Sequence, residues 1–360
     1  MPELPEVETV CKGLSKKILG KKIKNLKVLN SKLRKKIPKE IEMIFKEKII
    51  KIILRRGKHG LIFFNCDYTL LFHLGMTGKF FISNRKPLIK KHDHVSFEFE
   101  NNLFMLYNDV RKFGFIDFIK KPIDLINFNE LGYEPKVIHL YKKKIIKKIK
   151  KSYKSIKDIL LDQSFVSGIG NIYASEILFN AKINPKSTGE KISIIKLNNL
   201  LKSINLILDK AIEKGGSSIS DYNKVDGDLG YFQNNFRVYG RKGLSCFKCK
   251  NLIIQLKQSG RSTFYCRNCQ KWIMEKKFTS IIYKTINKVA VIELFRPDSL
   301  NALCDELMSE INFVLKKIEN DSNISVLILK GSEKSFAAGA DISEMEKKNF
   351  VDNLNNDFIK

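Results

Sequence analysis

Apolar and polar residues near the N-terminus alternate with the period of an α-helix. One apolar face recurs at positions i, i+3, i+4 and i+7 and contains Val7, Val10, Cys11 and Leu14. The first turns carry three carboxylates that suit the positive end of the helix dipole, Glu3, Glu6 and Glu8. The pattern predicts a helix from Glu3 to Leu19.

From about Ile23 to Ile119 the pattern changes to short β-rich runs separated by polar turns. The runs are Lys48–Leu54, Gly60–Phe64, Thr69–Leu74, Val95–Phe99 and Leu103–Tyr107. Closely spaced strands of this kind predict an antiparallel sandwich or barrel. The helical period returns after Pro122 and persists to about Lys214, so the predicted fold class is α+β.

A strongly basic run lies inside the helical part. Eight lysines fall between Tyr141 and Lys154, and Lys136 and Lys157 flank them. A solvated helix or an interdomain linker accounts for such a run at least as well as a phosphate-binding role does. The run alone therefore assigns no site.

Charge is distributed unevenly along the 360 residues. The net charge is +28, whereas residues 278–360 carry ten basic and 13 acidic residues, so the first 277 residues carry +31. A field of that sign favours nucleic acid or an anionic membrane as partner. AT-rich coding, which enriches Lys, Ile and Asn, is the alternative source of the excess.

Composition narrows the class of protein. With 43% hydrophobic residues and no apolar run of 18 residues, the sequence predicts a soluble globular protein without a transmembrane span. The acidic N-terminus is unlike a secretory signal. Seven unevenly placed cysteines argue against a disulfide framework and for a reducing compartment.

Four of these cysteines give the clearest chemical signal. They form two CxxC pairs 16 residues apart, Cys246, Cys249, Cys266 and Cys269. Four thiolates at this spacing suit a tetrahedral, structural Zn²⁺ site, and a redox pair or buried thiols are the alternatives. Between the pairs, Leu252–Leu256 and Thr263–Tyr265 predict a β-hairpin, with Arg261 near its tip.

The N-terminal Pro2 is a second candidate for chemistry. If Met1 is removed, Pro2 exposes a secondary amine, and α-amines titrate near pKa 7.7–8.0. Such an amine can attack an aldehyde-level carbon and form an iminium, with the adjacent Glu3 moving protons. A proline that merely opens a helix is the alternative.

Two further segments are weaker signals. The glycine turn Gly168–Gly170 delivers Asn171 to a helix start, where free backbone N–H groups can hold a phosphate. A second group of His and Asp residues lies between His73 and Asp109, but no complete metal-ligand set is evident in it. Met76 and Phe113 in that region would ordinarily be core residues.

Together these segments resemble the formamidopyrimidine-DNA glycosylase family, from Met1 to about Lys271. The resemblance is carried by MPELPEVET, RRGKHG, HLGMTGKF, KHDHV, RKFG, LGYEP, SGIGNIYASEILF, GGSSISDY, GYFQNNFRVYGR and RSTFYCRNCQK. It implies an N-terminal β-sandwich lobe (residues 1–125), a helix-two-turn-helix lobe (126–236) and a zinc ribbon (237–271). We expect a bacterial cytoplasmic monomer that binds double-stranded DNA and no membrane.

The resemblance also implies an activity, that of a bifunctional glycosylase and abasic-site lyase for oxidised purines. Pro2 would form a Schiff base with C1′ of the damaged nucleoside, Glu3 would act as general acid and base, and Lys58 would assist. Met76, Arg111 and Phe113 would fill the space left by the extruded base. The DNA backbone would be held by Asn171, Arg261, His92 and Lys157, and Gly215–Tyr231 matches the loop that closes over the base.

Two positions depart from the family pattern. Val110 replaces a proline in the Asp109–Phe113 loop, and Gly57 stands where alanine is common. Neither change removes a functional group, so activity is expected.

Residues 278–360 resemble the start of an enoyl-CoA hydratase. The resemblance implies an incomplete α/β crotonase-like segment in which the Ala340 N–H is half of an oxyanion hole, without the catalytic glutamates. A gene fusion or a reading frame that crosses into a second gene would explain it. A CoA-thioester enzyme, a non-catalytic damaged-DNA binder and an endonuclease VIII-like enzyme for oxidised pyrimidines are the competing functions.

Overall fold

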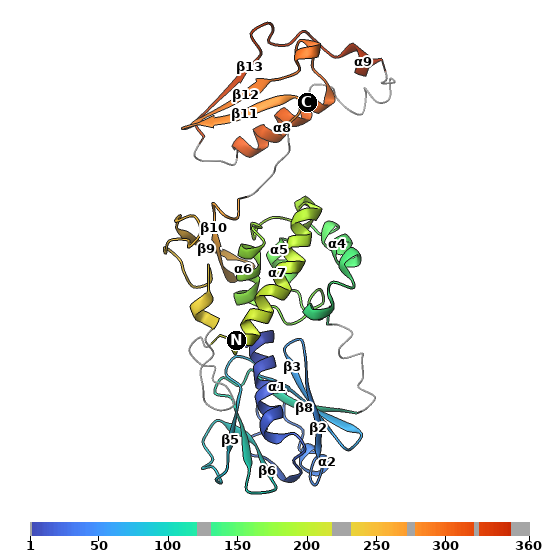
Figure 1. Cartoon of the computed structure of the whole chain (residues 1–360), viewed down its shortest axis with the longest axis vertical. Coiled ribbons are helices and arrows are strands. Elements are labelled where there is room, and N and C mark those ends of the chain that lie inside the picture. Colours follow the sequence, from blue (N-terminus) through green and yellow to red (C-terminus); the bar gives the residue numbers. More distant parts are fainter. Residues whose placement is uncertain (1, 121–130, 218–231, 272–277, 320–323, 347–360) are drawn as a thin grey trace. The chain divides into compact units, whose positions relative to one another are not determined.

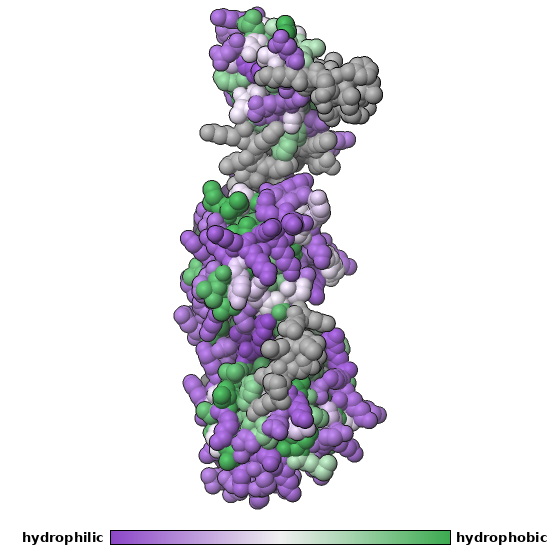
Figure 2. Space-filling model, turned by 90° about the vertical axis from the view of Figure 1, so that its right-hand side faces the viewer, coloured by the Kyte–Doolittle hydropathy of each residue, from purple (hydrophilic) through white to green (hydrophobic). Residues whose placement is uncertain are grey.

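The computed structural model describes residues 2–120, 131–217, 232–271, 278–319 and 324–346. The chain divides into two compact units, Met1–Trp272 and Ile273–Lys360 (Figure 1). Hydrophilic residues dominate the face seen in Figure 2, as the lysine-rich composition implies. None of the helices in the described ranges is long and apolar enough to cross a membrane.

Helix α1 (Leu4–Ile18) confirms the helix predicted from Glu3 to Leu19, with Glu3 at its N-cap. Its apolar face is buried along its whole length, from Leu4 to Ile18. Because α1 contacts both strand β2 (Ile50–Arg56) and helix α7 (Ile194–Glu213), it joins the two lobes of the larger unit.

Two four-stranded antiparallel sheets form the β-rich lobe and confirm the predicted sandwich. Their strand orders are β1-β6-β7-β5 and β2-β3-β4-β8. The elements are β1 Ile23–Val28, α2 Ile41–Ile44, β2 Ile50–Arg56, β3 His59–Phe64, β4 Tyr68–His73, β5 Lys79–Ser83, β6 Asp93–Phe99, β7 Phe104–Asn108 and β8 Phe115–Lys120. Both sheets and α1 share one apolar core rich in phenylalanine.

The second lobe is helical and has a core of its own, to which Leu4 of α1 contributes. Its elements are η1 Pro135–Val137, α4 Lys142–Lys150, α5 Ile156–Leu161, α6 Asn171–Asn180, η2 Gly189–Lys191, α7 Ile194–Glu213 and η3 Phe232–Asn235. Ser155 and Ser193 cap α5 and α7 by accepting backbone N–H bonds. The basic run forms α4, which buries Ile145 and Ile149 and exposes lysines around them.

The predicted hairpin is present as β9 (Ile253–Gln258) and β10 (Arg261–Cys266), which pair antiparallel. Ser259 and Gly260 turn the chain with φ of 48° and 76°. Arg261 is exposed at the first position of β10.

The smaller unit is a three-stranded sheet covered by one long helix. Its elements are β11 Ile281–Ile286, β12 Val289–Leu294, η4 Pro297–Ser299, α8 Asp305–Glu319, β13 Val326–Lys330 and α9 Ile342–Met345. β13 runs parallel to β12, and all five of its residues are exposed. The apolar core therefore lies mainly on α8, β11 and β12, with the buried Cys304 just before α8.

Candidate active site

Glu3 lies where α1 meets the N-terminus of α6. Its carboxylate accepts backbone N–H bonds from Gly170 at 2.7 Å and Ile172 at 2.9 Å, and Tyr173 donates a longer one at 3.3 Å. A Cβ on Gly170 would lie 2.4 Å from Cδ of Glu3, so only glycine fits this close approach. The predicted glycine turn thus fixes Glu3, and with it the buried Pro2 beside it.

A second buried carboxylate, Glu6, supports the first. Glu6 accepts the backbone N–H of Glu3 at 2.8 Å, which completes a capping box. Its other oxygen accepts the Tyr173 hydroxyl at 2.6 Å and the backbone N–H of Ser217 at 2.7 Å. From the sequence, Glu6 is expected only to interact with the helix dipole, although its position three residues after the N-cap also fits a capping box.

Lys58 is a buried cation close to these carboxylates. Burial lowers the pKa of Lys58, Glu3 and Glu6 oppose this, and Arg261 adds to it. Burial also raises the pKa of Glu3, with Lys58 opposing. Both shifts favour neutral forms, so Glu3 can donate a proton and Lys58 can accept one nearer to neutral pH than exposed groups would.

Met76 and the Arg111–Phe113 segment lie on adjoining loops. Gly75 approaches Gly114 so closely that a Cβ would lie 2.3 Å from the Gly114 nitrogen. The Arg111 guanidinium lies 4.9 Å from the centroid of the Phe113 ring, and Phe113 is 44% exposed. The structure thus brings together the three residues assigned to the space left by the base.

Asp109 braces this pair of loops. Its buried carboxylate accepts the Thr77 hydroxyl at 2.5 Å and the Gly114 N–H at 2.7 Å. The Thr77 oxygen in turn accepts the Arg111 N–H at 3.0 Å. These bonds fix the loop without the proline that Val110 replaces.

The histidines have different environments. His94 is a buried core residue whose ring bonds to the carbonyls of Asn30 and Asp109. His92 is partly buried, and its Nδ1 has no partner. His73, considered from the sequence only as part of a possible metal-ligand group, accepts the Gly75 N–H at 2.9 Å and supports the Met76 loop. Burial, with nearby His59 and Lys58, lowers its pKa to about 3, so this ring is neutral.

The four cysteines converge as predicted. Their Sγ atoms all lie within 4.8 Å of one another, and they are the only such group of potential metal ligands in the described part of the chain. A tetrahedron with Zn–S bonds of about 2.3 Å has S···S distances of about 3.8 Å, which this cluster fits. All four cysteines are free thiols rather than disulfides.

Two predicted DNA-binding residues attach the hairpin to the helical lobe. The buried Lys157 donates to the Ser262 carbonyl at 2.9 Å and the Thr263 hydroxyl at 2.7 Å, and burial lowers its pKa to about 8. Asn171 donates to the same Ser262 carbonyl at 2.9 Å, while its Oδ1 is buried without a partner. Both residues therefore position the strand that begins at Arg261.

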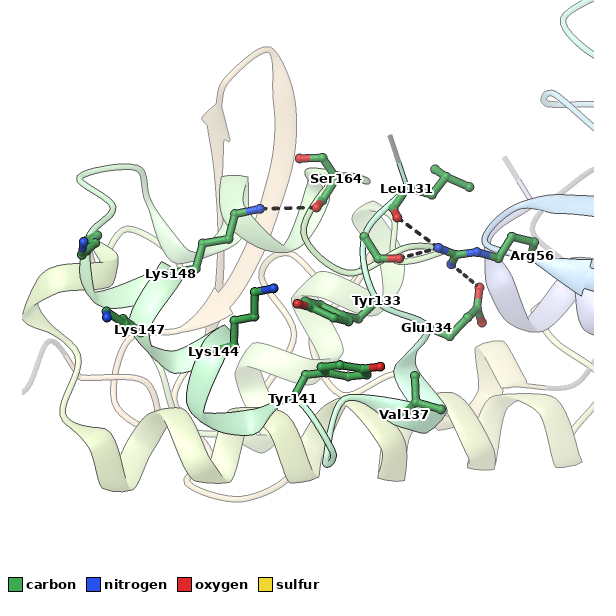
Figure 3. Close-up of a pocket in the computed structure, with 12 residues that line it drawn as sticks. Arg56, Leu131, Tyr133, Glu134, Val137, Tyr141, Lys144, Lys147, Lys148 and Ser164 are labelled. Atoms are coloured by element: carbon green, nitrogen blue, oxygen red, sulfur yellow. Dashed lines mark hydrogen bonds and ion pairs between the residues drawn. The ribbon is translucent and has the colours of Figure 1, made fainter. Parts of the chain in front are cut away.

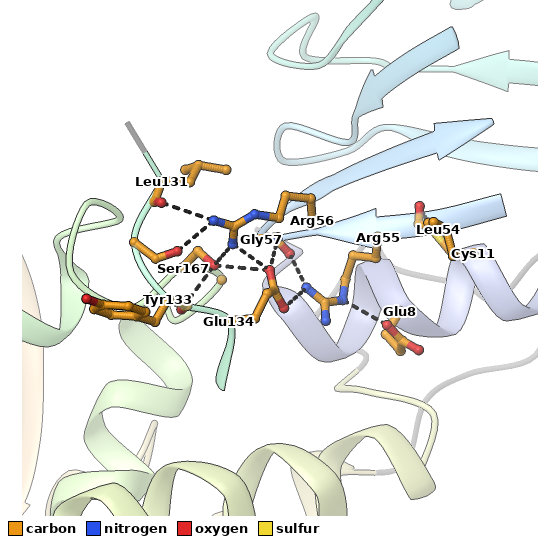
Figure 4. A network of polar contacts seen from close by, with 12 residues as sticks. Glu8, Cys11, Leu54, Arg55, Arg56, Gly57, Leu131, Tyr133, Glu134 and Ser167 are labelled. Carbon is orange, nitrogen blue, oxygen red and sulfur yellow. Dashed lines mark hydrogen bonds and ion pairs between the residues drawn. The ribbon is translucent and has the colours of Figure 1, made fainter. Parts of the chain in front are cut away.

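An ionic network that was not predicted from the sequence joins the two lobes at Arg55–Gly57, which directly precede Lys58 (Figure 4). Glu134 binds Arg55 at 2.8 Å and Arg56 at 2.9 Å and accepts the Gly57 N–H at 2.6 Å. Arg56 also donates to the Ser167 hydroxyl at 2.7 Å, next to the glycine turn. The network holds the β2–β3 turn, and hence Lys58, against the lobe that carries α6.

Family models match three parts of the chain. The formamidopyrimidine-DNA glycosylase N-terminal domain matches residues 1–116, and the H2TH domain of the same enzymes matches residues 131–223. The enoyl-CoA hydratase/isomerase model matches residues 284–358, in the smaller unit.

Similar whole proteins cover 75% of the chain. The formamidopyrimidine-DNA glycosylase of Zymomonas mobilis is 41% identical over its full length, and that of Rickettsia africae is 40% identical over 99% of its length. The structure of the Lactococcus lactis enzyme with DNA containing an abasic site matches with a TM-score of 0.69 and 36% identity, over 99% of that chain. The chain therefore belongs to the formamidopyrimidine-DNA glycosylase family, the bifunctional glycosylase/lyases that remove oxidised purines in base-excision repair.

Proposed function

We propose that this chain excises oxidised purines from duplex DNA with Pro2 as nucleophile and then cleaves the strand at the abasic site. The observation that carries the proposal is the junction of α1 and α6, where the glycine turn fixes Glu3 beside Pro2 and near Lys58. Solved relatives bound to abasic and formamidopyrimidine DNA support double-stranded damaged DNA as the partner. We propose a cytoplasmic monomer.

The proposed chemistry begins with removal of Met1, which frees the Pro2 secondary amine. This amine attacks C1′, the base departs, and the resulting iminium acidifies C2′ for β-elimination and then δ-elimination. Glu3, whose pKa is raised by burial, donates a proton to the sugar ring oxygen as the ring opens. Lys58, whose pKa is lowered by burial, lies near enough to assist proton transfer and bind the adjacent phosphate.

Extruding a base costs a few kcal/mol and leaves a gap in the stack. In the proposal, Phe113 wedges against the neighbouring pair, Met76 enters the gap, and Arg111 hydrogen-bonds to the unpaired cytosine. The hydrogen bonds of Asp109 to Thr77 and Gly114 support these roles, because they fix the loop of Met76 and the loop of Arg111 and Phe113 together. The Gly215–Tyr231 segment, proposed to close over the base, lies mostly outside the described residues.

The DNA backbone is assigned to Arg261 and Asn171, with His92 on the β-rich lobe. Lys157 supports this contact by binding the hairpin that begins at Arg261, and its own phosphate contact remains a proposal. A structural Zn²⁺ held by Cys246, Cys249, Cys266 and Cys269 fixes the base of the same hairpin. Zinc supplies no chemistry here, since four thiolates leave no open position.

Excision assays on two duplexes test the proposed substrate. An 8-oxoguanine:cytosine duplex should be cleaved to ends that both carry phosphate, and should be preferred over a thymine glycol duplex. The pyrimidine comparison matters because a solved relative holds DNA with an oxidised pyrimidine. A preference for thymine glycol would replace the oxidised-purine assignment with the endonuclease VIII-like one, and tight binding without cleavage would leave a damaged-DNA binder.

A further inference from the structure

A cavity of about 760 Å³ lies on the helical lobe and extends to Arg56 of β2, two positions before Lys58. It is lined by Arg56, by the segment around Leu131–Glu134, and by the basic helix α4 (Figure 3). None of the residues assigned to catalysis, base replacement, DNA-backbone contact or zinc lines it. Its size is within the range of small-ligand sites.

Four exposed lysines face this cavity from one side of α4 and its C-cap. They fall at the i, i+3, i+4 and i+7 positions, Lys144, Lys147, Lys148 and Lys151. Lys148 donates to the Ser164 carbonyl at 3.4 Å and lies over the Phe165 ring. In the described ranges, the other three have no carboxylate within ion-pair distance.

Among the residues that the structure describes, the only carboxylate that lines the cavity is already bound. Glu134 is paired with Arg55 and Arg56, and these ion pairs lower its pKa despite its burial. An anion that enters the cavity therefore contacts lysines that are not neutralised by a described carboxylate. The site selects for negative charge on these grounds.

Two stacked tyrosines give the cavity an aromatic wall. The rings of Tyr133 and Tyr141 lie 4.5 Å apart at 28°, and Tyr141 is 44% exposed. Figure 3 shows the pair beside Lys144, with Lys147 and Lys148 farther along the helix. An aromatic face next to a row of cations is the arrangement that binds single-stranded nucleic acid, with bases stacked and phosphates on the lysines.

We propose that this cavity is a second nucleic-acid site that binds single-stranded DNA, separate from the lesion site. One base stacks on the tyrosine pair, and consecutive phosphates contact Lys144, Lys147 and Lys151. An acidic peptide offers the charge but not the extended π-face, so nucleic acid is the better match. The site would hold a displaced or gapped strand while the duplex occupies the lesion site.

Fluorescence anisotropy with a labelled oligo(dT) of eight nucleotides tests the proposal on the full chain. Binding should persist when an unlabelled duplex with a stable abasic-site analogue saturates the lesion site. In a plot of the logarithm of the binding constant against the logarithm of the salt concentration, the triple variant K144Q/K147Q/K151Q should have a negative slope that is shallower by about 2. Each single-strand phosphate contact contributes about 0.7 to that slope. Tyr141→Ala should weaken binding roughly 5- to 150-fold.

Matched controls keep the result interpretable. The variant K39Q/K46Q/K51Q removes three exposed lysines from the β-rich lobe and should leave oligo(dT) binding unchanged. All variants should still cleave the 8-oxoguanine duplex if folded, which separates this site from the proposed catalytic function. Three results would each overturn the proposal. The first is displacement of oligo(dT) by the abasic duplex, and the second is an equal loss of oligo(dT) affinity in both triple variants. The third is stronger competition by an oligoglutamate peptide than by unlabelled oligo(dT).

Discussion

Replacing Glu134 by Gln should destabilise the larger unit, because it removes the charge on which two arginines converge. Glu134 is about one-fifth exposed and makes contacts of 2.6–2.9 Å to Arg55, Arg56 and Gly57. Each hydrogen bond to a charged group contributes about 1.5–3 kcal/mol, and breaking a buried pair costs about 3–5 kcal/mol. Both arginines keep other acceptors, so a loss of about 2–3 kcal/mol is expected.

For a unit of this size that loss corresponds to a fall in Tm of about 4–12 °C, measurable by calorimetry on the full chain. Glu40→Gln, at an exposed position, is the matched control and should change stability by less than about 0.5 kcal/mol. If Glu134→Gln has the same Tm as Glu40→Gln, the network does not stabilise the junction of the two lobes.

The stability gap should also depend on pH. Burial alone would raise the pKa of Glu134, but Arg55, Arg56 and the Gly57 N–H together lower it below its usual 4.5. A depressed carboxyl pKa stabilises the folded state above the unfolded pKa, and this contribution is lost as pH falls through the folded value. The gap between the parent chain and Glu134→Gln should be full at pH 6–7 and should shrink below about pH 4.5. A gap unchanged at pH 3 would contradict the electrostatic origin.

Three further changes test the proposed site. Gly170→Ala places a Cβ 2.4 Å from Cδ of Glu3 and should slow single-turnover excision about 100-fold. Gly20→Ala has open space around it but is strained by a φ of 75°, so it should lower stability and leave excision by the folded protein unchanged. Asp109→Asn weakens the bonds to Thr77 and Gly114 and should raise KM for the 8-oxoguanine duplex more than it lowers kcat; equal effects on undamaged-duplex binding would count against a base-replacement role. Cys266→Ala should lose the one zinc ion per chain, measured by elemental analysis, and should bind the duplex more weakly. Cys66→Ala should keep its zinc and its duplex affinity. A parent chain without zinc would refute the metal assignment.

Local patterns in the sequence predicted the elements well where one period dominates. Helix α1, five strands of the sandwich and the zinc-ribbon hairpin follow from apolar spacing and turn residues within a few positions. The convergence of the four cysteines likewise follows from two short spacings on a hairpin. The Pro2–Glu3 pair was a candidate from the chemistry of a secondary amine, but only the resemblance favoured it over a proline that opens a helix, because a proline and a glutamate near a helix start have no distinctive local pattern.

Long-range polar contacts could not be predicted in this way. Arg56 and Glu134 are 78 positions apart, and nothing in either neighbourhood indicates the other. Glu176 looks like an ordinary helical glutamate, yet it is buried and accepts the backbone N–H groups of residues 237–239. Lys157 follows a run of exposed lysines but is itself buried, because its amine meets the hairpin from a different part of the chain.

In the proposed mechanism, the Pro2 amine becomes covalently attached to the damaged nucleoside. Borohydride reduction of the full chain on an 8-oxoguanine:cytosine duplex, followed by peptide mapping, tests it most directly. We expect a trapped complex with the modification on Pro2, absent in Pro2→Gly, and formed equally by a chain ending at Lys277. A trapped lysine in place of Pro2, or no complex from a chain that binds the duplex tightly, would contradict it.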